Sequence, residues 1–277
     1  MGKKEYPLQL DKNNDVVAAN DLMKGKQKMT LREAQLLYLA ISNVVKYDKD
    51  FKTYTTTVKE LSTFMEIDEN SLYRDLKSIC IKLCSRTVII QVKGKNARKD
   101  KWKVFHWVDS ADYDEGKLTL RLSEDIKPYL LELNGCFSST RLYVLLSFES
   151  YYAVRLYQYL WAERNQSSRE QKEEWVFTIE QLRDLFQIEK GKYKQPRDLL
   201  KSTIIPALKE LDASPYFHYW NYQENKSTAR GKALLSIQFE AEFYETQEEK
   251  EKAFERARRI GDTDFDPNQV TMSDLLG

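Results

Sequence analysis

The segment KYKQPRDLLKSTIIPALKELDA, from Lys192 to Ala213, has the pattern of a helix with basic residues at its start, and this pattern indicates the fold. Pro196 suits the first turn of a helix, where no intrahelical donor is lost, so we expect the helix to begin there. A buried stripe at helical spacing follows, formed by Leu200, Ile204, Ala207 and Leu211. The opposite face should point outward and carries Asp198, Ser202, Ile205 and Lys209.

Pro206 lies in the middle of this predicted helix. Proline lacks a backbone donor and crowds the carbonyl four residues earlier, here that of Ser202, so the helix should bend at this point. The bend is either simple curvature over the core or a means for the first half to follow a groove in a partner.

A second copy of the pattern lies earlier in the chain. The segments VKELSTFMEI (Val58–Ile67) and IEQLRDLFQI (Ile179–Ile188) share a branched aliphatic residue, a leucine and a closing isoleucine at the same spacing. Each reads as a short helix, a polar turn and a second helix, which contains RDLKS (Arg74–Ser78) in one copy and RDLLKS (Arg197–Ser202) in the other. The longer second turn leaves two alignments open, on the LKS triplet or on the apolar stripe.

The second helix of the first copy, near Ser71–Cys84, repeats the arrangement. Its buried stripe is Leu72, Leu76, Ile79 and Leu83, and its outer face carries Arg74, Lys77, Ser78 and Ile81. On the two outer faces, Ile81 and Ile205 could touch thymine methyl groups or a partner subunit, or they could belong to the core.

A strand-rich segment with a polar tip follows each second helix. The first, Arg86–Val108, has a tip that carries Lys93, Lys95, Arg98, Lys99 and Lys101. The second begins at Phe217, ends near Phe239, and has a tip that holds Lys226, Arg230 and Lys232. Helix, turn, helix and basic hairpin make a winged helix, in which the second helix enters a major groove and the hairpin, or wing, lies along phosphates.

The chain of 277 residues is long enough for two such domains. We therefore expect an α+β protein with two tandem winged-helix domains related by an internal repeat. The expected domains are residues 1–134 and 135–244, followed by a charged helix and a disordered acidic tail at 245–277.

Charge is segregated along the chain, although the formal net charge is only +1. The segment Arg74–Lys103 carries ten basic residues against two acidic ones, whereas Glu240–Gly277 carries eleven acidic residues against five basic ones. Local potential, not net charge, attracts a polyanion, so the basic clusters favour double-stranded DNA as partner.

Three segments together resemble the winged-helix initiator Rep proteins of theta-replicating, iteron-type plasmids. They are VVAANDLMKGKQKMTLREAQLLYLAIS from Val16, SFESYYAVRLYQYLWAERN from Ser147, and STIIPALKELDA from Ser202. The resemblance covers about Val16–Phe243. It implies tandem winged helices that bind directly repeated origin sites, open the strands locally, recruit host helicase-loading or initiator proteins, and repress their own promoter as a dimer in equilibrium with monomer.

The candidate DNA contacts divide by chemistry, because lysines and loop arginines supply position rather than sequence information. The expected phosphate contacts are Lys77, Lys93, Lys101, Lys194, Arg197, Lys226 and Arg230. The same basic clusters contain Lys95, Arg98, Lys99, Lys192 and Lys232, and Ser78 lies on the same helix face as Lys77. Candidates for base edges, or alternatively for phosphate, are Arg74, Gln195, Lys201 and Ser202.

Catalytic and metal-dependent readings find little support, and we expect neither an enzyme nor a cofactor. The only histidines are His106 and His218, which are far apart in the sequence, and there is no GxxxxGK[ST] phosphate loop. Cys80 and Cys84 have no second pair of ligands and more simply border a core. The acidic segment Asp109–Gly116 lacks the ligand order of a calcium loop and reads as a hairpin turn.

The expected cellular location follows from the apolar runs and the cysteines. No apolar run approaches the length of a membrane span or a signal peptide, and three cysteines suit a reducing compartment, so the expected location is the cytoplasm.

In the tail, Gln269, Met272, Leu275 and Leu276 loosely resemble peptides that bind sliding clamps; a solubilising end or another replication partner are the alternatives. A transcriptional regulator without an initiation role remains the alternative function.

Overall fold

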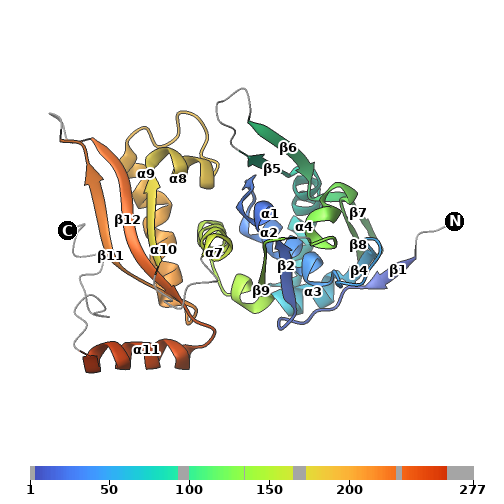
Figure 1. The fold of residues 1–277 in the computed structure, drawn as a ribbon. Helices are drawn as coiled ribbons and strands as arrows, with labels where there is room; N and C mark the ends of the chain where they lie inside the picture. The colour runs from blue at the N-terminus through green and yellow to red at the C-terminus, as the bar shows by residue number, and fades with distance from the viewer. Residues whose placement is uncertain (1–3, 93–99, 134, 165–172, 229–232, 261–277) are drawn as a thin grey trace. The chain divides into compact units, whose positions relative to one another are not determined.

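The structure is a computed structural model and describes residues 4–92, 100–133, 135–164, 173–228 and 233–260 (Figure 1). It divides into two compact units. The N-terminal unit comprises Met1–Ser147 with Trp161–Glu163, and the C-terminal unit comprises Phe148–Leu160 with Arg164–Gly277. Among the described residues, no helix is long and apolar enough to cross a membrane.

The core of the N-terminal unit forms around α2 (Leu31–Ser42). Thr30 begins this helix with a capping box, in which its hydroxyl accepts from the Glu33 amide while the Glu33 carboxylate accepts from the Thr30 amide. Ten of the twelve residues of α2 are buried, so the helix is central rather than amphipathic. The short helices around it are α1 (Asn20–Lys24), η2 (Glu124–Ile126), α5 (Lys127–Leu130) and α6 (Leu142–Leu146).

The predicted helix-turn-helix of this unit is confirmed as α3 (Val58–Met65) and α4 (Glu69–Ser85). A capping box of Thr57 and Glu60 begins α3, and the hydrogen bonds from Thr57 hold the pKa of Glu60 below its ordinary value. Asp68 caps α4 through the amide of Ser71, at 2.9 Å.

Three sheets complete the N-terminal unit. The largest has the order β1-β4-β8-β7 and contains β1 (Glu5–Pro7), β4 (Thr53–Thr57), β7 (Val108–Asp114) and β8 (Lys117–Leu122). A second has the order β3-β5-β6 and contains β3 (Lys26–Gln27), β5 (Thr87–Val92) and β6 (Lys101–His106). The third pairs β2 (Asp15–Ala19) with β9 (Phe137–Arg141).

The hairpin predicted at Arg86–Val108 exists as β5 and β6, but its assignment as the wing of the helix-turn-helix is wrong. Its strands pair with β3, not with β4, the strand that leads directly into α3. The hairpin that joins β4 is instead β7–β8, which turns at Glu115 and Gly116 with φ of 44° and 86°. The segment Asp109–Gly116, predicted to be a hairpin turn, is mostly strand β7, and only Glu115 and Gly116 form the turn. The β7–β8 hairpin is the topological equivalent of a wing.

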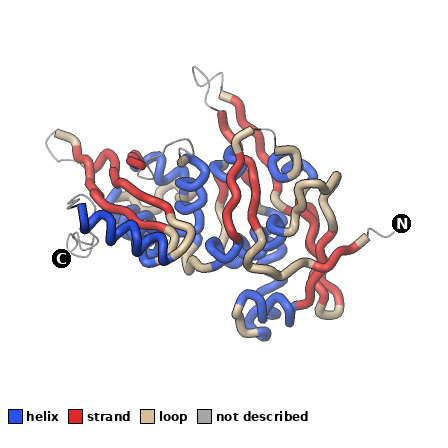
Figure 2. The backbone as a smooth tube through the Cα atoms, turned by 60° about the horizontal axis from the view of Figure 1, so that its bottom comes forward, coloured by secondary structure: helices blue, strands red, loops and turns tan. Residues whose placement is uncertain are grey.

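The C-terminal unit has the expected winged-helix order of elements. It contains most of α7 (Tyr151–Glu163), then β10 (Glu173–Thr178), α8 (Ile179–Leu185), α9 (Pro196–Ser202), α10 (Ile204–Ala213), β11 (Phe217–Lys226), β12 (Leu234–Phe243) and α11 (Gln247–Ile260). Figures 1 and 2 show β11 and β12 as two long neighbouring strands. The sheet order β10-β12-β11 repeats the order β4-β8-β7 of the first unit. The two units therefore share one topology.

The internal repeat extends to the details of the backbone. A capping box of Thr178 and Gln181 begins α8, as Thr57 and Glu60 begin α3. Each helix is followed within two residues by one with positive φ, Glu66 at 54° and Gln187 at 47°. The amide of the following isoleucine then bonds to the carbonyl five residues earlier, at 3.0 Å for Ile67 and 2.9 Å for Ile188. The repeat seen in the sequence is a structural repeat.

The single bent helix predicted at Lys192–Ala213 is wrong in one respect. The helix does begin at Pro196, but it breaks at Thr203, where φ is −133° and ψ is −81°. The break makes Pro206 the third residue of α10, in a first turn whose amides have no intrahelical acceptor, so the proline removes no hydrogen bond. Two short helices therefore replace the bend expected at Pro206.

Candidate nucleic-acid interface

The first basic face lies on α4. Arg74, Lys77 and Ser78 are all exposed, as the helical phase predicted. The Arg74 guanidinium lies 3.2 Å from the Asp75 carboxylate, and both side chains are more than half exposed, so solvent weakens this pair and leaves Arg74 available to a polyanion. The outer face of α4 is thus basic and accessible.

The same helix carries an apolar surface, of which the helical phase predicted Ile81 but not Tyr73. Tyr73 is 61% exposed and Ile81 is 62% exposed, which places Ile81 on the outer face and excludes it from the core. Beside them a groove of about 810 Å³ separates α4 from β7 and β8, and Tyr113 on β7 meets Tyr73 edge to face at 6.0 Å between ring centroids. Helical periodicity could not predict this groove, because the groove depends on which hairpin, here β7–β8, joins the sheet beside α4.

The second basic element is the hairpin of β5 and β6. Lys101 is exposed, as predicted, and so is its neighbour Lys103. The tip residues Lys93, Lys95, Arg98 and Lys99 lie outside the described residues. Trp102, between these two lysines, is 67% exposed, and Val104, after them, is 46% exposed. Neither apolar side chain was predicted from the sequence as part of the site. Alternating lysine, tryptophan and lysine could have identified this strand as an interaction surface.

In the C-terminal unit, the loop before α9 is held in place by Arg183 of α8. Its guanidinium donates to the backbone carbonyl of Lys192 at 2.9 Å and to that of Tyr193. Two residues of this loop have positive φ, Gly191 at 91° and Tyr193 at 50°. The loop is therefore a fixed turn that presents its basic side chains from a defined backbone.

All the sequence-predicted residues of this loop and of α9 are exposed and lie together on one segment. They are Lys192, Lys194, Gln195, Arg197, Lys201 and Ser202. Because α9 begins at Pro196, the side chains of Lys194, Gln195 and Arg197 cluster at its N-terminus, where the helix dipole also favours an anion. This cluster is the strongest candidate for a phosphate site in the unit.

One predicted outward residue is instead buried. Ile205 is 5% exposed and belongs to the core. The predicted stripe of Leu200, Ile204, Ala207 and Leu211 is buried and Lys209 is exposed, so the predicted faces hold on both sides of the break at Thr203 except at Ile205. Ile205 therefore cannot contact DNA bases or a partner subunit.

The wing of the C-terminal unit is the hairpin of β11 and β12. Lys226 is exposed near its end, with its ammonium 3.5 Å from the Glu224 carboxylate. Arg230 and Lys232, at the predicted tip, lie outside the described residues. Of the predicted wing cations, the structure therefore places Lys226 alone.

The cysteines of α4 occupy structural positions. Cys80 is buried, and burial raises the pKa of its thiol to about 12. Cys84 is partly buried. Within the described residues, no three His, Cys, Asp or Glu side chains are grouped to hold a metal ion. These thiols therefore border the core, as their spacing indicated.

Comparisons with known proteins agree with the duplicated fold. A replication initiation protein of Escherichia coli is 27% identical over 203 residues, which cover 72% of this chain and 60% of that protein. The chain thus spans about three fifths of that relative's length. The crystal structure of the Pi initiator protein in complex with iteron DNA is similar with a TM-score of 0.63 and 17% identity, covering 85% of this chain and 99% of the other.

Family models match both units. The model described as Initiator Replication protein, WH1, matches residues 15–161, and the model described as Initiator Rep protein, WH2, matches residues 178–241. Together they cover more than half of the chain, and each falls on one of the two winged helices. The chain therefore belongs to the family of initiator replication proteins with two winged-helix domains.

Proposed function

We propose that this protein initiates plasmid replication by binding directly repeated sites, or iterons, in double-stranded origin DNA. The observation that carries the proposal is the duplicated helix-turn-helix, whose second helices, α4 and α9, each expose basic residues. Family membership supports initiation as the function, and the Pi initiator protein, which shares the fold, is a protein that binds iteron DNA. In this scheme each second helix enters a major groove.

The proposed contacts follow from side-chain chemistry and exposure. Lys77 and Lys101 in the N-terminal unit, and Lys194, Arg197 and Lys226 in the C-terminal unit, bind phosphates and set the register. Arg74, Gln195, Lys201 and Ser202 reach base edges, since arginine and glutamine can bind guanine and adenine through two hydrogen bonds. The functional domains are then residues 1–134 and 135–244, with 245–277 as an appended segment.

Binding leads to two further steps in the proposed scheme. The bound protein destabilises an adjacent AT-rich stretch, so that the strands open locally, and it recruits host helicase-loading or initiator proteins. No cofactor and no catalytic residue take part, because binding energy and DNA deformation supply the work. The process takes place in the cytoplasm, where plasmid DNA lies.

The N-terminal unit also forms the proposed dimer that represses the protein's own promoter, in equilibrium with the monomer that binds iterons. The strand β6 supports this role, because it lies at the edge of its sheet and exposes Trp102 and Val104. Light scattering should find two chains on the promoter site and one on each direct repeat. The same stoichiometry on both sites would contradict the switch.

The segment after Ile260 binds a replication partner in the proposed scheme, with the sliding clamp as one candidate through Gln269, Met272, Leu275 and Leu276. A chain truncated after Ile260 should retain repeat binding but fail to maintain the plasmid. Normal copy number with this truncated chain would leave the segment a solubilising role only.

The alternative function is that of a transcriptional regulator that uses the same two domains without initiating replication, because fold alone does not distinguish the two. A vector without its own origin, carrying the DNA that flanks this gene, tests the choice when the protein is supplied from a second replicon. An initiator should sustain the vector, and a protein lacking the basic side chains of α9 should not. Repression without replication would favour the regulator.

A further inference from the structure

The helix α11 begins after the segment matched by the family model, which ends at residue 241, yet it packs on the C-terminal unit. Ala253 of α11 joins Trp220 of β11 and Tyr244 in a buried cluster, and Phe254 packs against it. Phe254 also meets the ring of His218 edge to face, with 4.7 Å between centroids. The face of α11 turned to the unit is therefore part of its core.

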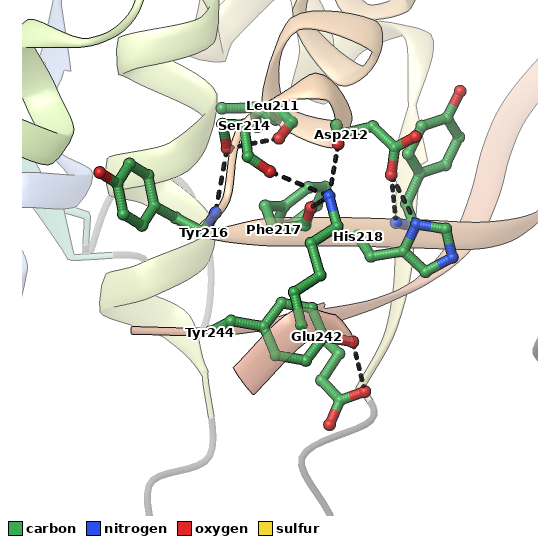
Figure 3. A network of polar contacts seen from close by, with 10 residues as sticks. Leu211, Asp212, Ser214, Tyr216, Phe217, His218, Glu242 and Tyr244 are labelled. Carbon is green, nitrogen blue, oxygen red and sulfur yellow. Dashed lines mark hydrogen bonds and ion pairs between the residues drawn. The ribbon is translucent and has the colours of Figure 1, made fainter. Parts of the chain in front are cut away.

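The most unusual residue of this face is Lys250, which is only 7% exposed. Its ammonium donates to three backbone carbonyls, at 2.5 Å to Asp212, 2.9 Å to Ser214 and 2.8 Å to Phe217. Burial lowers the pKa of Lys250, and the three acceptors match the three protons of an ammonium group. Figure 3 shows Asp212, Ser214 and Phe217 gathered in this network.

The three carbonyls belong to the end of α10 and to the turn that leads into β11. The last carbonyls of a helix lack intrahelical donors and carry the negative end of its dipole, so a buried cation stabilises them. The side chain of Asp212 also holds this turn. Its carboxylate accepts a hydrogen bond from the amide of Tyr219 at 3.3 Å and lies 2.6 Å from Nδ1 of His218. Lys250 thus adds a contact from α11 to a turn that is also held by Asp212 and by the Tyr244 amide, which donates to the carbonyl of Tyr216 at 3.0 Å.

This turn joins the two DNA-binding elements of the unit. On one side α10 continues from α9, the helix with the exposed basic cluster; on the other side β11 begins the wing, which carries Lys226. A winged helix binds well only if its helix reaches the groove while its wing reaches the phosphates, so the angle set at this turn determines whether both contacts form together.

We propose that α11 is a working part of the second DNA-binding domain, and that Lys250 is a positioning residue that fixes the reading helix relative to the wing. The inference rests on the proposed function, since it assigns the turn a role in DNA binding. It extends the functional domain beyond the expected end at residue 244. Lys250 itself does not touch DNA; it acts through the turn.

The test compares Lys250→Met, which retains the length of the side chain but not its donors, with Lys252→Met on the exposed face of α11. The probes are a duplex containing the repeat that the wild-type chain protects at its own locus and a random-sequence duplex of equal length. Lys250→Met should lower the ratio of specific to nonspecific affinity about tenfold, because the helix and the wing no longer bind in register. Lys252→Met should leave this ratio unchanged.

A general loss of stability is distinguished by a third variant. Val154→Ala removes buried volume from α7, which does not form the turn, and should reduce stability without changing the specificity ratio. If Lys250→Met does not fold, Phe254→Ala takes its place, because it loosens α11 without removing the ammonium. An unchanged ratio in the folded variant overturns the proposal. Wild-type protein that shows no preference for its repeat would instead contradict the proposed function.

Discussion

Arg86 and Glu33 form a two-point ion pair that ties the end of α4 to the beginning of α2. Nε of Arg86 lies 2.7 Å from one carboxylate oxygen of Glu33, and a terminal nitrogen lies 3.2 Å from the other. Glu33 is almost wholly buried, at 1% exposure, and also closes the capping box of α2. Because Arg86 is the residue that follows α4, this pair sets the position of α4, the proposed DNA-binding helix, relative to the central helix of its unit.

Replacing Arg86 with methionine should destabilise the N-terminal unit by about 3 kcal/mol, because a buried carboxylate then loses its cation. Chemical denaturation followed by circular dichroism measures this change. Arg74→Met is the matched control, since that arginine is exposed and should cost no more than about 0.5 kcal/mol. Equal losses in the two variants would mean that the buried pair has no special role.

Alanine substitutions of the two isoleucines predicted on outer faces, Ile81 and Ile205, should differ clearly in their effect on stability. Ile205→Ala should cost about 3 kcal/mol of stability, since its side chain is 5% exposed. Ile81→Ala should change stability by no more than about 0.5 kcal/mol, since that side chain is 62% exposed. Thermal unfolding of both variants measures the difference, and similar melting temperatures would contradict the burial of Ile205.

The capping boxes of α3 and α8 should contribute alike, because they occupy equivalent positions in the repeat. Thr57→Ala and Thr178→Ala should each lower stability by about 1 kcal/mol. Thr63→Ala is the control: its hydroxyl bonds to a carbonyl within α3 and caps no helix end, so alanine there should be neutral or slightly stabilising. A loss at Thr63 as large as at Thr57 would rule out capping as the cause.

The basic cluster at α9 should contribute to affinity through phosphates. Arg197→Ala should weaken binding to every sequence and reduce the slope of log affinity against log salt by about 1. Lys194→Ala should behave in the same way, whereas Lys252→Ala, on the exposed face of α11, should leave the slope unchanged. Fluorescence anisotropy across a salt series measures all three. An unchanged slope in both Arg197→Ala and Lys194→Ala would remove α9 from the interface.

Local sequence patterns predicted the repeat and the start of α9 because these depend on residues close together in the chain. The pairing of strands does not: β5 pairs with the two-residue β3, some 60 residues earlier, and alternation identifies a strand without naming its neighbour. This is why the wing of the first unit was assigned to Arg86–Val108 instead of β7–β8.

The candidate site was predicted in part for a related reason. Exposure of Arg74, Lys77, Arg197 and Lys201 follows from helical phase, which holds within one uninterrupted helix. Beyond the break at Thr203 the phase still places Ala207 and Leu211 in the core and Lys209 outside, but it misplaced Ile205, which is buried beside the stripe. The role of Lys250 could not be found from charge, because a lysine in an acidic segment reads as a solvated residue until its three carbonyl acceptors are known.

The central claim is that both units read DNA in adjacent major grooves of one repeat, through α4 and α9. Footprinting of the purified chain across the DNA around its own gene tests it most directly. We expect each direct repeat to show two adjacent protected blocks, with centres about 10 bp or a multiple apart on one face of the duplex. One block per repeat would contradict the tandem reading, and uniform protection without regard to sequence would contradict specific recognition altogether.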